Sequence, residues 1–371
     1  MVASASASWI WVCFFILLID DSLLTWPSRN LVNLLPATSQ RAIWTLLPEA
    51  CEGNASPDCS TIRGGTWRIN ASSTGYTAVT DQTTSVSNFT LPYDVEQFLA
   101  SSLPANIPNA IDLNATAAAG TGFVRFGYRG DNGDPLDQQL IFSLPGEAPY
   151  VGTLGLSPYN TSFTGDPGYW STLGKLNFTG QIKSASWAYN AGAYYRDAYS
   201  SLTFGGYDAK RGDISKGLQV NMPNDLKELV VYVKDISLGT TGGTTSVAST
   251  AQSWFIDSTI PDMWLPEAAC KSFEDAFGLV YNTTYEKYFV DPSLHDDLVR
   301  RNASVTFTLS ASADDTQTTQ IFFPYAALNL TAKWPLIGGS EYTAETLQYF
   351  PLKRASDPSQ FFLGRAFLQE A

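Results

Sequence analysis

The sequence has very few of the residues that carry nucleophilic or metal-dependent chemistry. Its 371 residues include one histidine, His295, four cysteines and three methionines. A single histidine argues against a Ser-His-Asp or Cys-His mechanism and against a histidine-rich metal site. No CxxC pair, P-loop or GxGxxG motif is present. We therefore expect neither a metal ion nor a cofactor, and we interpret His295 as an ordinary surface residue.

Basic residues are also scarce. Lys and Arg number 22 against 35 Asp and Glu, which gives a formal net charge of −13 at pH 7. Phosphate binding needs clustered Lys and Arg, and no basic run is visible. We therefore exclude nucleic acid as a partner. The acidic surplus favours solubility, with adaptation to acidic surroundings as the alternative.

The apolar run near the N-terminus is too short to span a bilayer. WIWVCFFILLI covers only residues 9 to 19, whereas a spanning helix needs about 20 residues. We predict that residues 1–28 are a signal peptide or signal anchor, which would allow membrane attachment through this segment. No Lys or Arg precedes the run, and no small-x-small cleavage site follows it, so an N-terminal β-strand is the alternative.

The composition indicates a mostly β protein with many turns. The chain has 28 Gly, 20 Pro, 13% aromatic and 44% apolar residues, and short apolar runs are separated by Gly, Pro, Asn and Asp. Its length allows two domains or one two-lobed body. Local patterns predict strands at 123–128, 218–222, 228–238 and 304–310, a helix at 270–280 and a flexible loop at 239–252.

Asparagine sequons and cysteines indicate the secretory pathway. Nine Asn-X-Ser/Thr sequons occur where about three are expected by chance. We predict N-glycans on them and a secreted or cell-surface location. The sequons are Asn54, Asn70, Asn88, Asn114, Asn160, Asn177, Asn282, Asn302 and Asn329. Cys51 and Cys59 enclose a polar loop and predict a local disulfide, whereas Cys270 has no obvious partner.

One pattern occurs twice, 220 residues apart. ATSQRAIWTLLPEAC covers residues 37–51, and DSTIPDMWLPEAAC covers residues 257–270. Each copy has a tryptophan seven positions after its head, Trp44 or Trp264, and then runs through Leu-Pro-Glu-Ala. A separation of this size indicates two similar lobes. Each copy is later followed by an apolar stretch ending in glycine, VGTLG to Gly155 and FFLG to Gly364. A glycine in such a strand predicts close approach of another backbone.

These motifs resemble the pepsin-like aspartic peptidases, and most closely their divergent fungal branch. Further blocks carry the resemblance: SASWAYNAGAYYR, SLTFGGYDAKR, FFPYAALNL and YFPLKRASDPSQFFLGRAFLQEA. The resemblance implies an all-β, two-lobed acid-protease fold with a central cleft that holds a peptide or protein ligand, in a chain that we expect to be a monomer. It divides the chain into an N-terminal lobe at 29–200 and a C-terminal lobe at 201–371, the latter cut short at its end.

In this family each lobe donates one aspartate from a hydrophobic-Asp-Thr/Ser-Gly loop. Asp257 matches the second-lobe aspartate and Ser258 its hydroxyl neighbour, while Thr259 stands at the glycine position. In the first lobe, the resemblance places Ala37 where the aspartate belongs. Two carboxylates that share a proton split their proton affinities, and an alanine removes that arrangement.

The resemblance also implies that several residues around these two positions support the loops. Thr38 matches the family's threonine, and Ser39 replaces its glycine. The two tryptophans and the two glycines of the repeat complete this set, which consists of Trp44, Trp264, Gly155 and Gly364. The segment FILLIDDSLL offers Asp21 as an alternative first acid, although no tryptophan follows it at the right spacing. Tyr93 matches the family's flap tyrosine by position only.

Three functions are compatible with this pattern. The first is a secreted or surface-attached pepsin-like domain that is impaired in catalysis and binds peptides or partners. The second is an aspartic endopeptidase, active at acidic pH, that pairs Asp257 with a non-standard acid. The third is a β-rich wall or matrix protein that keeps the fold only as a scaffold.

Overall fold

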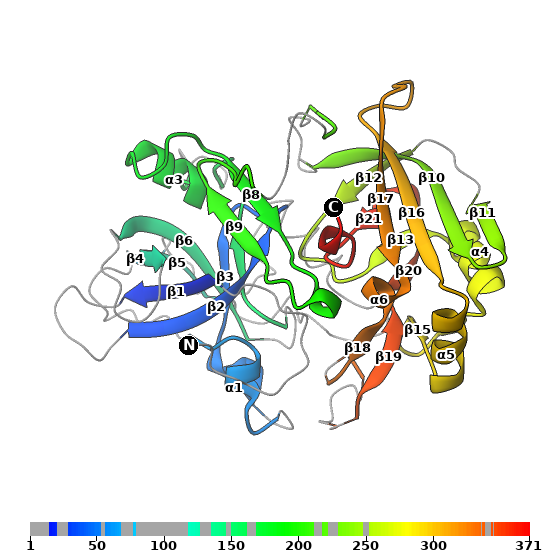
Figure 1. Ribbon diagram of the computed structural model, residues 1–371. Helices are drawn as coiled ribbons and strands as arrows, with labels where there is room; N and C mark the ends of the chain where they lie inside the picture. Colours follow the sequence, from blue (N-terminus) through cyan, green and yellow to red (C-terminus); the bar gives the residue numbers. More distant parts are fainter. Residues whose placement is uncertain are drawn as a thin grey trace.

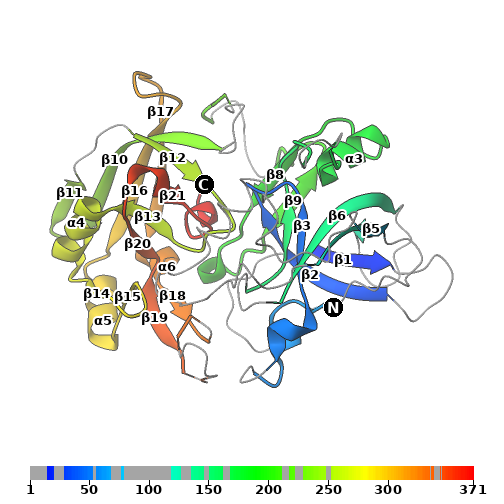
Figure 2. The same cartoon turned by 180° about the vertical axis from the view of Figure 1, so that it is seen from behind.

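The computed structural model forms two lobes built mainly of β-strands, which lie side by side (Figure 1). It describes residues 15–20, 29–52, 56–67, 77–78, 118–126, 135–145, 150–161, 168–210, 217–221, 229–247 and 252–371, apart from 335, 338–342 and 344. Blue to green strands make up one lobe and yellow-green to red strands the other, as the view from behind also shows (Figure 2). The prediction of an all-β, two-lobed fold is therefore confirmed.

Seven strands form the sheet of the first lobe, in the order β1-β2-β7-β3-β6-β5-β4. They are β1 (Phe15–Asp20), β2 (Arg29–Ala37), β3 (Ile43–Leu46), β4 (Thr77–Ala78), β5 (Ala118–Phe126), β6 (Leu136–Leu144) and β7 (Thr153–Gly155). Because β1 pairs with both β2 and β5, the sheet closes on itself. Among the described residues of this lobe, three short helices occur: η1 (Pro48–Cys51), α1 (Cys59–Ile62) and α3 (Thr172–Phe178).

Strand β1 lies within the segment that the sequence predicts to be a signal peptide or anchor. Its backbone pairs antiparallel with β2 and β5, which is the arrangement of the N-terminal strand considered as the alternative. The rest of residues 1–28 lies outside the described residues, so the signal segment stays a prediction. Among the described residues, no helix has both the length and the apolar character that crossing a membrane requires.

The second lobe has an eight-stranded sheet and a four-stranded sheet. The larger sheet contains β10 (Val230–Thr240), β11 (Gly243–Val247), β12 (Gln252–Ile256), β13 (Met263–Pro266), β16 (Ser304–Ser310), β17 (Thr318–Pro324), β20 (Leu352–Ala355) and β21 (Phe362–Leu363). The smaller sheet contains β14 (Val280–Asn282), β15 (Lys287–Phe289), β18 (Leu330–Ala332) and β19 (Leu347–Phe350). The helices are α4 (Glu267–Phe277), α5 (Pro292–Arg300), α6 (Tyr325–Leu328), η5 (Pro358–Gln360) and η6 (Phe367–Gln369).

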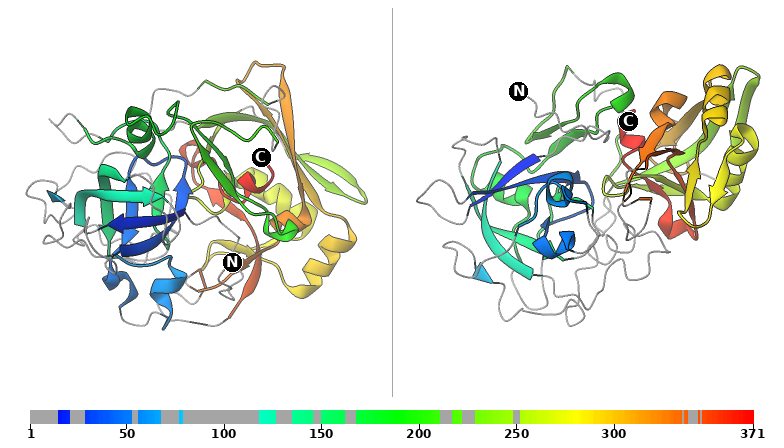
Figure 3. Two further views of the ribbon diagram at one scale, coloured as in Figure 1. Left: turned by 60° about the vertical axis from the view of Figure 1, so that its left-hand side comes forward. Right: turned by 90° about the horizontal axis from the view of Figure 1, so that it is seen from below.

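A hairpin lies between the two lobes. It consists of β8 (Trp187–Asn190) and β9 (Ser201–Phe204), with η3 (Tyr194–Arg196) between them, and it appears in green in both views of Figure 3. Trp187 and Phe204 pack against the first-lobe core, whereas Tyr195 packs against the second-lobe core. The Tyr195 hydroxyl also donates to Glu370 Oε1 at 2.6 Å. The predicted lobe boundary between residues 200 and 201 falls inside this connecting hairpin.

Several local predictions can be compared with the elements. Strand β16 covers its predicted range, and β10 overlaps the range predicted for it. Helix α4 overlaps the predicted helix but ends at Phe277, and Val280 belongs to β14 instead. The prediction of a flexible loop at 239–252 is wrong for residues 239–247, because β10 continues to Thr240 and β11 pairs back onto it, while residues 248–251 lie outside the described residues. Threonine favours strands through its β-branched side chain, even where the composition is rich in glycine. Residues 218–221 lie outside any strand, contrary to the prediction.

Candidate functional site

The two copies of the repeat form matching loops, one in each lobe. In the first lobe, Ala37 lies opposite Gly155 where β2 runs parallel to β7, and β3 returns antiparallel to β7. In the second lobe, β12 runs parallel to β21 up to Ile256 opposite Leu363, and β13 returns antiparallel to β21. The two loops therefore share the same strand pairing, so residues 220 apart occupy equivalent positions.

Thr38 and Ser258 join the two loops through reciprocal hydrogen bonds. The Thr38 backbone N–H donates to Ser258 Oγ at 3.0 Å, and the Ser258 backbone N–H donates to Thr38 Oγ1 at 3.0 Å. Ser258 Oγ also donates to the Pro36 carbonyl at 2.6 Å. Both residues are buried, so their backbone N–H groups cannot reach water and need these hydrogen bonds as partners. This pair of hydrogen bonds, called the interlobe clasp below, fixes the distance between the two loops.

Asp257 is buried next to the clasp, with 7% of its surface exposed. Its Oδ1 accepts a hydrogen bond from the Thr259 backbone N–H at 2.8 Å and another from Thr259 Oγ1 at 2.6 Å. Burial raises the pKa of this carboxyl, while the Thr259 donors, the Ser39 hydroxyl and the charge of Arg365 act in the opposite direction. Thr259 and the Ser39 hydroxyl are thus hydrogen-bond donors to Asp257.

Ala37 occupies the equivalent position in the first lobe. It is fully buried, and its carbonyl accepts hydrogen bonds from Leu156 N at 2.9 Å and Gln40 N at 3.3 Å. In the second lobe the corresponding turn is closed by Ile260 N, which donates to the Asp257 carbonyl at 3.2 Å. The backbone of the loop is therefore the same in both lobes, and the side chain is the difference. A methyl group neither accepts a proton nor binds water.

The two motif glycines lie where a second backbone passes at close range. A Cβ on Gly155 would be 2.6 Å from the Gln40 carbonyl oxygen and 2.7 Å from that of Ala42. A Cβ on Gly364 would clash in the same way with the carbonyl oxygens of Asp262 and Ile260. Both glycines therefore permit the close approach expected from the sequence.

The two repeat tryptophans pack behind the loops. The Trp44 ring stacks on Phe142 with ring centroids 4.4 Å apart. The Trp264 ring meets Phe362 edge to face at 6.0 Å, and Lys353 Nζ lies 4.1 Å from its centroid. Both tryptophans are buried, so they support the strands that leave the loops and do not line the site.

Arg365 is a site residue that the sequence reasoning missed. Its Nη1 donates to the carbonyls of Ser258 at 2.6 Å and Thr259 at 2.9 Å. Its own backbone N–H donates to the Ile260 carbonyl at 2.7 Å. The guanidinium is partly buried beneath the second-lobe loop and holds its shape. Its position directly after the motif glycine Gly364 is the sequence signal that could have identified it.

A buried ion pair lies further beneath the same loop. Lys287 Nζ donates to Asp262 Oδ2, and both side chains are almost fully buried. The same Nζ lies 5.3 Å from the centre of the Tyr349 ring. Buried charges are stable only when paired, so Lys287 and Asp262 depend on each other. The residue of the first lobe that corresponds to Asp262 is Ala42, so this ion pair has no counterpart there. The difference between the two copies is visible in the sequence.

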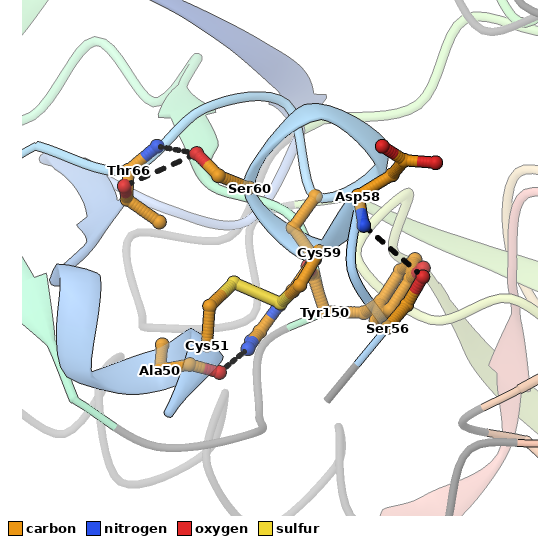
Figure 4. The surroundings of a disulfide bond; sticks show 9 residues. Ala50, Cys51, Ser56, Asp58, Cys59, Ser60, Thr66 and Tyr150 are labelled. Carbon is orange, nitrogen blue, oxygen red and sulfur yellow. Dashed lines mark hydrogen bonds between the residues drawn. A yellow bond between two sulfur atoms is a disulfide. The ribbon is translucent and has the colours of Figure 1, made fainter. Parts of the chain in front are cut away.

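The predicted disulfide between Cys51 and Cys59 is confirmed. It joins η1 to α1, with Cα atoms 5.7 Å apart (Figure 4). Buried Arg63 donates to the Ala50 carbonyl and, through Nε, to the Tyr150 carbonyl at 3.0 Å, so it fixes the same segment. Cys270 is a buried free thiol, and burial raises its pKa to about 12.

The other predicted positions divide into described and undescribed residues. Asp21, Tyr93 and four of the sequon asparagines (Asn54, Asn70, Asn88 and Asn114) lie outside the described residues. Of the remaining sequons, Asn160, Asn177 and Asn302 are exposed, while Asn282 and Asn329 are half-buried. His295 is half-buried on α5, and its Nδ1 lies 3.0 Å from the Tyr325 hydroxyl. Within the described parts of the chain, no three His, Cys, Asp or Glu side chains gather as metal ligands would.

Comparison with known proteins relates this architecture to one class of fold. The chain is similar to the crystal structure of an aspartic proteinase from Irpex lacteus, with a TM-score of 0.54 and 13% sequence identity. The match covers 97% of this chain and 89% of the other. No protein-family model matches the sequence, and no curated protein does. The likeness defines a pepsin-like fold for this chain.

Proposed function

We propose that this chain is a secreted or surface-attached, N-glycosylated pepsin-like domain that binds peptide or protein ligands and is impaired in hydrolysing them. The observation that carries the proposal is the pair Ala37 and Asp257. They hold equivalent positions on either side of the interlobe clasp, and only one of them has a carboxyl group. The intact clasp supports a retained ligand-binding site, and the alanine supports lost catalysis.

The chemistry of acid proteolysis explains why one carboxyl is insufficient. One acid must take a proton from water while the other donates a proton to the substrate carbonyl. Two neighbouring carboxyls achieve this because their proton affinities differ. Asp257 has hydroxyl and backbone donors as its neighbours, and a serine or threonine hydroxyl does not exchange protons readily in this pH range.

A second candidate is an acidic endopeptidase that pairs Asp257 with an acid from elsewhere in the chain. The observation that favours it is the environment of Asp257: the carboxyl is buried and hydrogen-bonded, and burial raises its pKa. Such tuning is common in catalytic acids, although structural residues also show it. Asp21 is the acid that the sequence offers for this role.

Binding and cleavage can be tested in one experiment. The glycosylated, secreted protein is incubated with a mixed peptide pool at pH 3 to 6, and bound peptides are identified by mass spectrometry. We expect peptides to be recovered intact and to be displaced by a peptide-like inhibitor of aspartic peptidases. Recovery of cleaved peptides would favour the second candidate. Absence of bound peptide, together with stable association with cell-wall material, would favour the scaffold function.

A further inference from the structure

Two large aromatic side chains are exposed together on the first lobe. Trp170 and Phe178 are 39% and 69% exposed, and their ring centroids lie 4.9 Å apart. Trp170 precedes helix α3, at the upper left of Figure 1, and Phe178 is the last residue of that helix. Contiguous exposed apolar surface is where binding sites are found, and these two rings are in contact with each other. We call them the α3 ring pair.

A sequon asparagine adjoins this ring pair. A Cβ built on Gly174, in the middle of α3, would lie 3.3 Å from Trp170 Cε3 and 3.5 Å from Asn160 Oδ1. The indole and the carboxamide of Asn160 therefore flank the same glycine. Asn160 Oδ1 accepts a hydrogen bond from Ser171 N at 3.1 Å, which orients the carboxamide. Asn160 as a whole is exposed, as a glycosylated side chain must be.

We propose that the α3 ring pair binds the inner sugars of an N-glycan attached to Asn160. The glycan comes from a lipid-linked oligosaccharide diphosphate: the C1–O bond to the diphosphate breaks, a bond from C1 to Nδ2 forms, Nδ2 loses one proton, and the lipid diphosphate leaves. The C–H face of a pyranose ring is apolar and flat, which suits an exposed indole. Attachment to Asn160 gives the sugar a high effective concentration at Trp170.

Asn177 provides a contrast within the same helix. It is also an exposed sequon asparagine, and it directly precedes Phe178. Its Nδ2, however, donates a hydrogen bond to the Ile182 carbonyl at 3.3 Å, so that nitrogen is turned toward the chain that follows the helix. We therefore assign the ring pair to the Asn160 glycan. The assignment rests on the secretion included in the proposed function and is independent of peptide binding.

A double-mutant cycle on the glycosylated, secreted protein tests the contact. Ser162→Ala removes the sequon and keeps Asn160, and Trp170→Ser removes the indole. We expect Ser162→Ala to lower the Tm by about 1–3 °C when Trp170 is present, because the sugar–indole contact should be about as strong as a contact between two aromatic rings. In the Trp170→Ser background, the same substitution should lower the Tm by less than half as much. The matched control is Phe322→Ser, a 55% exposed aromatic of the second lobe. Its effect and that of Ser162→Ala should be additive.

A spectroscopic readout tests the same contact without reference to stability. The N-acetyl methyl protons of the first sugar should show an upfield ring-current shift that is lost in Trp170→Ser, and reduced in Phe178→Ser if the first variant folds poorly. Mass spectrometry of the Asn160 peptide measures occupancy. The proposal would be overturned if Asn160 carried no glycan. It would also be overturned if the Tm effects of Ser162→Ala and Trp170→Ser were additive and the N-acetyl methyl protons resonated at the chemical shift of a free glycan. Peptide binding is measured separately, so the two proposals can fail independently.

Discussion

At the scale of single residues, Asp257 has a carboxyl that is stabilised in its protonated form by burial. A carboxyl with a pKa raised by folding binds its proton more tightly in the folded state. Its contribution to stability is therefore complete below the ordinary pKa of 3.8 and is lost as the pH rises through the raised value. Asp257→Asn removes this dependence. We expect the Tm of the variant, relative to the native protein, to increase from pH 3 to pH 7 in calorimetric scans.

Asp291 provides a control of opposite sign. It caps helix α5, and its pKa is lowered by hydrogen bonds, first from the Leu294 backbone N–H and then from the Ser293 hydroxyl. Its contribution is present above the ordinary pKa and is lost as the pH falls. The Tm of Asp291→Asn, relative to the native protein, should therefore decrease from pH 3 to pH 7. A trend of the same sign in both variants would contradict this account of Asp257.

Arg365 is predicted to be the main support of the second-lobe loop. Arg365→Met leaves the carbonyls of Ser258 and Thr259 without their donor. Because each buried unpaired group costs about 1–3 kcal/mol, we expect a loss of roughly 2–4 kcal/mol in the free energy of unfolding, discounted for the partial exposure of the guanidinium. Urea denaturation measures it, with Arg300→Met as a control on an exposed surface ion pair. Equal effects of the two substitutions would refute the assignment.

Some site residues could be predicted from the sequence repeat, and others could not. Asp257 and Ala37 could be located because each copy carries its own tryptophan at the same spacing. The interactions of Arg365 and Lys287 could not be predicted, because they arise from strands that are remote in sequence and meet only in the folded sheet. Arg365 could have been singled out by its place directly after Gly364, but its hydrogen-bond partners could not.

At the scale of elements, the two glycines set how closely the strands approach the loops. Gly155→Ala and Gly364→Ala would each place a Cβ against backbone carbonyl oxygens, which cannot move without shifting a strand. We expect each substitution to lower the free energy of unfolding by about 1–3 kcal/mol or more. Gly206→Ala is the matched control, because nothing lies within 4 Å of its added Cβ. Denaturant midpoints would measure all three, and a benign Gly364→Ala would contradict the close approach.

The interlobe clasp gives a prediction about coupling between elements. Thr38→Val and Ser258→Ala each leave a buried backbone N–H of the opposite loop without its acceptor. Residues that share hydrogen bonds show interaction energies of about 0.5–3 kcal/mol in double-mutant cycles. We expect the double variant to be destabilised by less than the sum of the single variants. Strict additivity in urea denaturation would mean that the two loops are not joined in this way.

Elements with a strong apolar period were predictable, whereas connecting hairpins were not. SVTFTLS alternates apolar and polar residues and forms β16 over the predicted residues. The glycine- and threonine-rich segment after β10 has no such pattern, and its pairing with β10 becomes visible only in the fold. The β8–β9 hairpin likewise gains its importance from contacts with both lobes.

At the scale of the whole molecule, the chain has a pepsin-like fold although its sequence is only 13% identical to that of the similar aspartic proteinase from Irpex lacteus. Each lobe has its own buried core, and the loops, glycines and tryptophans hold the same strand pairing in both. Packing and close backbone approach require residue types and spacings, and do not require a second aspartate. The fold is therefore compatible with an alanine at position 37.

The measurement that tests the central claim most directly is peptide turnover at acidic pH. The protein, expressed through a secretory pathway, is assayed with a quenched-fluorophore peptide pool from pH 3 to 6, with Asp257→Asn as the control and Ala37→Asp alongside. The account predicts no turnover by the native protein above the Asp257→Asn control, because Ala37 provides no second carboxyl. Turnover by the native protein that disappears in Asp257→Asn would contradict it and would show that Asp257 works with another acid.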